Sequence, residues 1–189
     1  MRILKLVSAG LLVLVAVIVG IGALLPAGVH VERRIDIRAE PDAVFPHINN
    51  LRSFIEWSPW ARLDPDTTYR FEGPVAGKGA RMLWHSDDPR VGSGMQEIIA
   101  SVPNQRVAVA LSFGDRGDAV AYYDLQLIAG ATQVTWGFDT EFGWDIVGRY
   151  LGLMFDQWVG ADYERGLVRL KALVEGGPAS PPSAANNSG

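Results

Sequence analysis

The sequence has no cysteine and only three histidines among its 189 residues. The missing thiols exclude disulfide scaffolds, cysteine nucleophiles and sites in which cysteine binds zinc or an iron–sulfur cluster. A metal site built from histidine would need nearly all of His30, His47 and His85. The net charge is −4 and no local run of basic residues is present, so we expect no nucleic-acid partner.

Common catalytic motifs are missing as well. The sequence contains no G-x-S-x-G, no H-E-x-x-H, no phosphate-binding P-loop and no G-x-G-x-x-G after a predicted strand. The remaining polar candidates are predicted to lie in a solvated loop, in a turn and at a helix rim: His85 with Asp87 and Asp88, Asp64 with Asp66, and His47. From the residues alone we predict no catalytic group, no metal and no cofactor.

Hydrophobic residues make up 48% of the chain and are concentrated at the N-terminus. The segment Leu6–Leu25 carries no charge and, as a helix, is long enough to span the roughly 30 Å hydrocarbon core of a bilayer. Its apolar stretch exceeds the roughly 7–15 residues usual in a signal peptide, and cleavage after Ala27 would place the large Leu25 at position −3. The pattern therefore favours an uncleaved anchor over a cleaved signal peptide.

The flanking residues suggest an orientation and three regions. Arg2 and Lys5 precede the apolar segment, which favours a cytoplasmic N-terminus and a domain outside the cytoplasmic membrane. Residues 1–28 are the predicted anchor and residues 29–175 form one domain. Residues 176–189 are built from Gly, Pro, Ser, Ala and Asn, so we predict a disordered tail.

Periodicity within 29–175 indicates a strand, two short helices, six successive strands and a long helix. The first strand (29–38) alternates apolar and polar residues, but Arg33 falls on its apolar side, so it lies at the rim or the alternation slips there. Pro41 suits the start of the first helix, and Pro46 should kink or split it. A second helical piece covers 51–56. In the strand 95–102, adjacent Ile98 and Ile99 leave the inward face open.

The last segment changes to a helical period and ends at Gly176. A break near Gly152 could divide it. Its apolar stripe is predicted to comprise Val147, Leu151, Met154, Trp158, Ala161, Leu167, Leu170 and Val174. Six successive strands joined by short turns imply an antiparallel meander, and the long helix must cover its apolar face. We therefore predict an α+β fold in which a curved sheet grips one helix around an apolar cavity.

Five stretches carry a resemblance to a known superfamily: AEPDAVFPHINNLRSFIEWSPW (39–60), FEGPVAGKGARMLW (71–84), VGSG (91–94), TQVTWGF (132–138) and YERGLVRLKALVE (163–175). Together they resemble the SRPBCC superfamily, whose helix-grip fold is shared by START lipid-transfer domains, the birch-pollen allergen and the polyketide cyclase/dehydrase group. Members of this last subgroup often carry an N-terminal membrane helix. The resemblance implies a cavity that the two short helices close, but it leaves the function open.

Aromatic and methionine side chains are the candidate ligand-binding residues, because six tryptophans are many for one domain. The predicted set comprises Trp57, Trp60, Phe71, Met82, Trp84, Tyr123, Trp136, Met154 and Trp158. Core packing is the alternative for each residue. In the resemblance, Trp57 and Trp60 overhang the cavity mouth; otherwise they pack on the end of the long helix and seal the core.

Three function classes follow. The first is a domain anchored in the membrane by residues 6–25 that binds a hydrophobic small molecule or lipid without catalysis. The second is a cyclase or dehydratase acting on a polyketide-like or isoprenoid substrate; it needs an acid–base pair facing the cavity, and Arg33 is the one clear polar candidate. The third is an envelope interaction or stress module that holds no ligand. The ligand's identity and the oligomeric state stay open.

Overall fold

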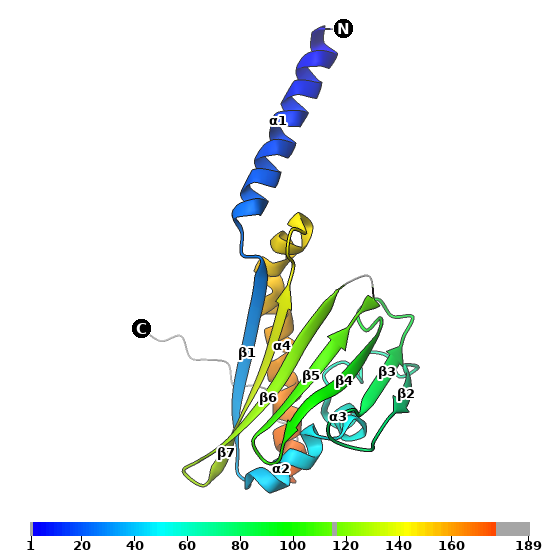
Figure 1. Ribbon diagram of the computed structural model, residues 1–189, viewed down its shortest axis with the longest axis vertical. Coiled ribbons are helices and arrows are strands. Elements are labelled where there is room, and N and C mark those ends of the chain that lie inside the picture. The colour runs from blue at the N-terminus through cyan, green and yellow to red at the C-terminus, as the bar shows by residue number, and fades with distance from the viewer. Residues whose placement is uncertain (1, 115–116, 177–189) are drawn as a thin grey trace.

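The computed structural model describes residues 2–114 and 117–176. An extended helix, α1 (Arg2–Leu24), leads into a domain whose curved sheet holds one long helix (Figure 1). The window Lys5–Leu24 has a mean hydropathy of 2.7 and is long enough to cross a membrane. Because only 6% of this window is buried, α1 is not a core helix of the domain. A membrane anchor and a signal sequence are both compatible with such a helix.

Seven antiparallel strands form the sheet: β1 (Gly28–Ile37), β2 (Thr68–Glu72), β3 (Arg81–His85), β4 (Ser93–Val102), β5 (Arg106–Ser112), β6 (Asp118–Ile128) and β7 (Ala131–Glu141). Their order is β1-β7-β6-β5-β4-β3-β2, so the last six follow one another as a meander and the first pairs with the last. This arrangement confirms the predicted α+β helix-grip fold.

Register explains the ambiguity at Ile98 and Ile99. The pairing of β4 with β5 shifts between Ile98 and Ala100, which marks a β-bulge. Ile98 is fully buried and Ile99 is exposed, so the two side chains lie on opposite faces of the strand. The side chains of Gln96 and Ile98 therefore face the core from β4.

Two short helices, α2 (Pro41–Ile48) and α3 (Leu51–Trp57), close the end of the domain opposite α1 (Figure 1). Pro41 begins α2, as expected. Pro46 does not split α2, which continues through it to Ile48. The side chain of Asn50 accepts a hydrogen bond from the backbone N–H of Arg52 and caps α3.

The long helix α4 (Ile146–Glu175) runs unbroken, so the break considered near Gly152 is absent. The side chain of Asp145 caps its first turn, and Gly176 ends it in the left-handed region, with φ +67°. Of the tail predicted for 176–189, only this glycine lies among the described residues.

The predicted apolar stripe of α4 holds for its second half alone. Leu167 and Leu170 are buried, as expected, whereas four residues of the first half are exposed: Val147, Leu151, Met154 and Trp158. The buried face there contains Gly148, Gly152 and Gly160 instead. A Cβ at Gly152 would lie 2.7 Å from the Phe142 ring, so glycine lets the helix approach the sheet closely. A hydropathy pattern does not reveal a packing face made of glycines. The buried face predicted for the first half of α4 was therefore wrong.

Candidate functional site

The centre of the domain, between the sheet and α4, is filled by aromatic rings. Trp136 of β7 stacks on Tyr163 of α4 with ring centroids 3.7 Å apart. Trp57 of α3 packs edge-on against Trp136 at 5.2 Å and against Tyr123 of β6 at 5.9 Å. All four side chains are buried. Three of the predicted ligand-binding residues, Trp57, Tyr123 and Trp136, thus meet in one cluster. Tyr163, the fourth member, was not among the predicted residues.

The aromatic cluster is an apolar environment with few partners for polar atoms. Burial raises the pKa values of Tyr123 and Tyr163, so both phenols stay neutral at physiological pH. The Nε1 of Trp136 is buried without a hydrogen-bond partner among the described residues. Trp57 differs, because its Nε1 donates to the carbonyl oxygen of His47 at 3.1 Å.

Trp60 lies at the edge of this cluster and is half-buried. Its ring packs edge-on against Trp136 and Tyr163, with centroids 6.0 Å and 6.3 Å away. Its Nε1 donates to the Oδ2 of Asp162 at 3.0 Å. Trp60 thus packs against the long helix through Tyr163 and Asp162, and the hydrogen bond to Asp162 engages the donor that a ligand would otherwise use.

A second apolar region lies on β3–β5. Met82 is buried, and half-buried Trp84 packs edge-on against Phe113 with centroids 5.9 Å apart. Gln96 of β4 is buried in this region, and its Nε2 lies 3.9 Å from the Sδ of Met82, a weak acceptor. The sequence did not predict Gln96 as an inward residue, because it left open which face of β4 points inward. Gln96 lies two residues before Ile98, and residues two apart in a strand share a face, so this spacing was the signal that could have identified it.

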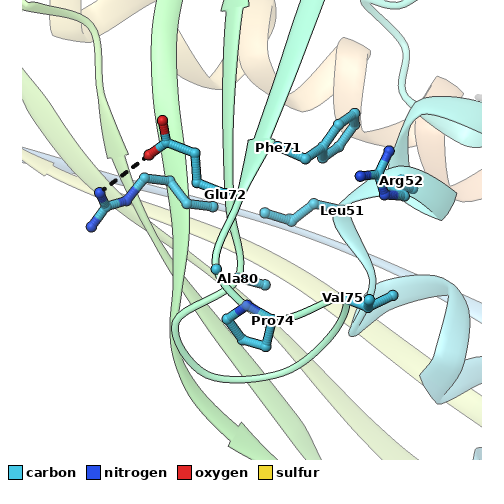
Figure 2. A pocket seen from close by; sticks show the side chains of 9 residues that line it. Leu51, Arg52, Phe71, Glu72, Pro74, Val75 and Ala80 are labelled. Atoms are coloured by element: carbon cyan, nitrogen blue, oxygen red, sulfur yellow. Dashed lines mark ion pairs between the residues drawn. The ribbon is translucent and has the colours of Figure 1, made fainter.

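Phe71 lines a small pocket at the edge of the sheet (Figure 2). The guanidinium of Arg52 lies 4.0 Å from the centre of the Phe71 ring, and Leu51 and Val75 border the space. The pocket's volume is about 60 Å³, whereas pockets that enclose a drug-sized molecule measure about 300–1,000 Å³. Phe71 is the one residue of the predicted set in this pocket.

Met154 and Trp158 do not face the interior. They are 42% and 48% exposed, so the expectation that they line an enclosed cavity is wrong. With Val147 and Leu151 they form a continuous line at helical spacing, which we call the α4 stripe. Asp162, the partner of Trp60, follows Trp158 by one turn on the same side of the helix. The α4 stripe therefore leads from the start of α4 to Trp60.

Arg33 connects β1 to α4. There is no slip in the strand, because Val31, Arg33 and Ile35 all lie on its inward phase. The guanidinium reaches across Gly160 and pairs with Asp156 at 2.9 Å and Glu164 at 2.8 Å. The hydrogen bond with Asp156 raises the pKa of Arg33. Arg33 is therefore held by two carboxylates in a structural bridge.

The other polar candidates lie in turns and at a helix rim. Asp64 accepts from the backbone N–H of Asp66, and Asp88 pairs with Arg90, whose hydrogen bonds lower the pKa of Asp88 to about 2. His85 lies 2.7 Å from the hydroxyl of Ser93. His47 lies 3.0 Å from the hydroxyl of Ser53. Across residues 2–114 and 117–176, no group of three or more His, Asp or Glu side chains could hold a metal ion.

One polar cluster lies on the outer face of the sheet and was not expected. Tyr122 donates to Glu32 at 2.9 Å, and His30 lies 2.7 Å from Asp139. Partial burial acts to raise the pKa of Glu32, but hydrogen bonds from Tyr122 and Arg34 outweigh it and the pKa is lowered. Partial burial and the bond to Glu32 raise the pKa of Tyr122 to about 12. The cluster faces away from the aromatic interior.

Solved structures share this fold at low sequence identity. A protein from Chromobacterium violaceum, CV1439, is 15% identical with a TM-score of 0.55, and the match covers 80% of this chain and 99% of that one. The allergen Ara h 8.0201 is 11% identical, with a TM-score of 0.53 and coverage of 79% and 99%. DynU16, from the dynemicin biosynthetic locus, is 19% identical with a TM-score of 0.56; the match covers 80% of this chain but only 49% of DynU16.

No match was found among curated proteins. The sequence model of a family described as "Polyketide cyclase / dehydrase and lipid transport" matches residues 28–175, which is the whole domain after α1. The match starts at the first residue of β1 and ends at the last residue of α4. The chain therefore belongs to this SRPBCC-type family of polyketide cyclases, dehydrases and lipid-transport proteins.

Proposed function

We propose that this chain is a membrane-anchored domain that binds a hydrophobic small molecule or a lipid chain. The observation that carries the proposal is the α4 stripe, in which four large apolar side chains lie uncovered along one side of a helix. A contiguous exposed apolar patch on a soluble domain usually marks a binding surface. The family description includes lipid transport, which agrees with an apolar ligand.

The geometry also limits how the ligand is held. The aromatic cluster occupies the centre of the fold, so the ligand lies along the α4 stripe towards Trp60. Met154 and Trp158 lie on that path and are 42% and 48% exposed. The polar contacts available nearby are few, because Asp162 already accepts from Trp60 and pairs with Arg165. Apolar burial therefore dominates the affinity, and binding depends weakly on salt.

Native mass spectrometry of the full-length protein released from detergent micelles tests this function. We expect the wild type to carry an apolar molecule that can be identified by fragmentation. Trp158→Ala and Met154→Ala should lower its occupancy several-fold, because each removes contact area. Leu127→Ala is the control: Leu127 is 53% exposed and lies near the β6–β7 hairpin. This hairpin is at the end of the domain far from α1 (Figure 1).

A ligand-free role as an envelope interaction module is the second candidate. The tightly filled aromatic centre favours it, because a domain that encloses no ligand needs no empty cavity. This candidate predicts ligand-free protein and no change in tryptophan fluorescence or melting temperature with a panel of fatty acids and isoprenoids. That result would contradict ligand binding. Chemical turnover of an added compound would instead favour the cyclase or dehydratase alternative.

A further inference from the structure

The β7–α4 connection and the first turns of α4 form an exposed apolar surface. Trp144 is 82% exposed, the highest value for a large apolar residue among the described residues of the domain. Val147, one turn further on, is 68% exposed. We call the segment Trp144–Leu151 the junction, because α1 ends beside it (Figure 1). An indole so exposed is costly in water unless another phase covers it.

The junction is fixed to the end of α1 by hydrogen bonds. The hydroxyl of Tyr150 donates to the carbonyl oxygen of Ile18 at 2.7 Å. The buried guanidinium of Arg149 donates to the carbonyl oxygens of Ala23 at 2.8 Å and Leu25 at 3.1 Å. Carbonyl groups in the last turn of a helix lack intrahelical donors, so Arg149 satisfies two acceptors there. The domain and α1 are thus joined by more than the chain connection.

Side-chain packing supports the same contact. Gly22 of α1 faces Ile146 and Tyr150 so closely that a Cβ at this glycine would lie 2.5 Å from Ile146 and 2.9 Å from Tyr150. Glycine at position 22 therefore lets α4 approach the backbone of α1. Arg149 also lies 5.3 Å from the centre of the Trp144 ring, which connects the exposed indole to the same contact.

The position of Ile18 sets the height of the junction along α1. Ile18 precedes the end of α1 at Leu24 by six residues, or about 9 Å of helix. If α1 spans the bilayer, the carbonyl that binds Tyr150 lies about that far inside the apolar segment. Ile146, at the start of α4, lies beside Gly22, only two residues before the end of α1, so the first turn of α4 lies near the end of the apolar segment, where it meets the headgroups. Trp and Tyr side chains favour this interfacial region of a membrane.

We propose that the junction docks into the interfacial layer of the bilayer that holds α1, with Trp144 and Val147 in contact with lipid. The α4 stripe begins at Val147, so its first residues open directly to the membrane. A lipid or isoprenoid ligand passes from the bilayer to the α4 stripe without crossing bulk water. This inference rests on the proposed membrane anchor and names the surface from which the ligand enters.

Charge argues for apolar rather than electrostatic docking. Asp118, Glu141 and Asp145 lie at the same end of the domain, where β6 begins, β7 ends and α4 is capped. These carboxylates repel an anionic surface, and salt screens that repulsion. Docking should therefore be as deep or deeper in phosphatidylcholine vesicles than in vesicles rich in phosphatidylglycerol.

Spin labels in the full-length chain can measure this docking, because the sequence offers no native cysteine for the label to react with. Val147→Cys reports on the junction, Val13→Cys on the middle of α1, and Leu127→Cys on the far end of the domain. Each protein is labelled and reconstituted into phosphatidylcholine vesicles. Its collisions with oxygen, which concentrates in lipid, are compared with collisions with a water-soluble nickel chelate.

We expect the labels at positions 13 and 147 to collide mainly with oxygen and the label at 127 mainly with nickel. Trp144→Ser should shift the label at 147 towards water, whereas Val75→Ser, an equally exposed change in the β2–β3 loop, should not. A label at 147 that meets nickel while the label at 13 meets oxygen would overturn docking and leave the anchor intact. A label at 13 that meets nickel, or protein that does not float with vesicles, would overturn docking together with the anchor.

Discussion

At the residue scale, Leu170 and Trp158 of α4 have opposite surroundings. Leu170 is fully buried in the core, whereas nearly half of Trp158 is exposed. Removing buried apolar atoms costs their transfer free energy and leaves a cavity. Removing exposed atoms leaves no cavity. The same helix therefore contains one residue that stabilises the fold and one that is available to a ligand.

The first prediction compares these two residues. Leu170→Ala should lower the free energy of unfolding by about 2–5 kcal/mol, and Trp158→Ala should lower it by about 1 kcal/mol or less. Urea unfolding of the full-length protein in micelles, followed by circular dichroism, measures both changes. Equal losses would show that Trp158 packs in the core.

The second prediction concerns the buried phenols of Tyr123 and Tyr163. Their folded-state pKa values are raised by burial, so above about pH 10 the unfolded chain releases protons that the folded chain retains. The free energy of unfolding should be independent of these groups below about pH 10 and fall above it, by at most about 1.4 kcal/mol per pH unit for each phenol. Urea unfolding between neutral and strongly alkaline pH measures the slope.

Phenylalanine variants provide the control for this pH dependence. Tyr123→Phe and Tyr163→Phe each remove one ionisable group, so each should make the alkaline slope shallower. An unaltered slope in both cluster variants would mean that other groups cause the alkaline loss.

At the element scale, α4 packs by means of glycines. Gly152 faces Phe142 and Val29, Gly160 faces the Arg33 guanidinium, and Gly166 faces the Trp136 ring. Glycine in a helix interior normally costs up to about 1 kcal/mol relative to alanine. In α4 the close packing offsets this cost, because a larger residue at these positions would clash with the side chains that face them.

Gly152→Ala is the third prediction. Its new Cβ would lie 2.7 Å from Phe142 and 3.0 Å from Val29, so the change should destabilise the protein by about 1–3 kcal/mol despite the better helix propensity of alanine. Thermal and urea unfolding measure the loss. In a Phe142→Ala background the closest atom is gone, and the penalty should shrink; an equal penalty in both backgrounds would exclude the predicted clash.

At the scale of the whole molecule, the apolar helix α1 and the domain that follows it are joined at one end. Figure 1 shows α1 extending away from the sheet, while α4 starts beside its C-terminal end. The hydrogen bonds of Arg149 and Tyr150 make this join a defined contact. The arrangement fits a domain held against a bilayer, and it fits less well with cleavage near Ala27, which would remove the carbonyl partners of Arg149.

The fourth prediction is that full-length protein stays in the membrane fraction through alkaline carbonate washing and needs detergent for extraction. A chain shortened to begin at Val29 should be recovered without detergent, because the apolar α1 is gone. It should also unfold more readily, since Arg149 loses its acceptors on α1. Recovery of a mature chain that begins near Gly28 in the soluble envelope fraction would instead indicate a signal peptide.

Local patterns in the sequence were enough to predict the order of the elements, the curved antiparallel sheet, the apolar helix at the N-terminus and the inward positions of Met82, Tyr123 and Trp136. These features follow from local hydropathy periods and turn residues, which do not depend on distant contacts. Tertiary structure alone decided the phase of the first half of α4, the inward position of Gln96 and the pairing of Arg33 with Asp156 and Glu164. Each depends on how two elements pack. Glycines allow α4 to lie close to the sheet, and a β-bulge shifts the register of β4 against β5. Because glycines occupy the buried face in the first half of α4, the large apolar residues of that half lie on its exposed face.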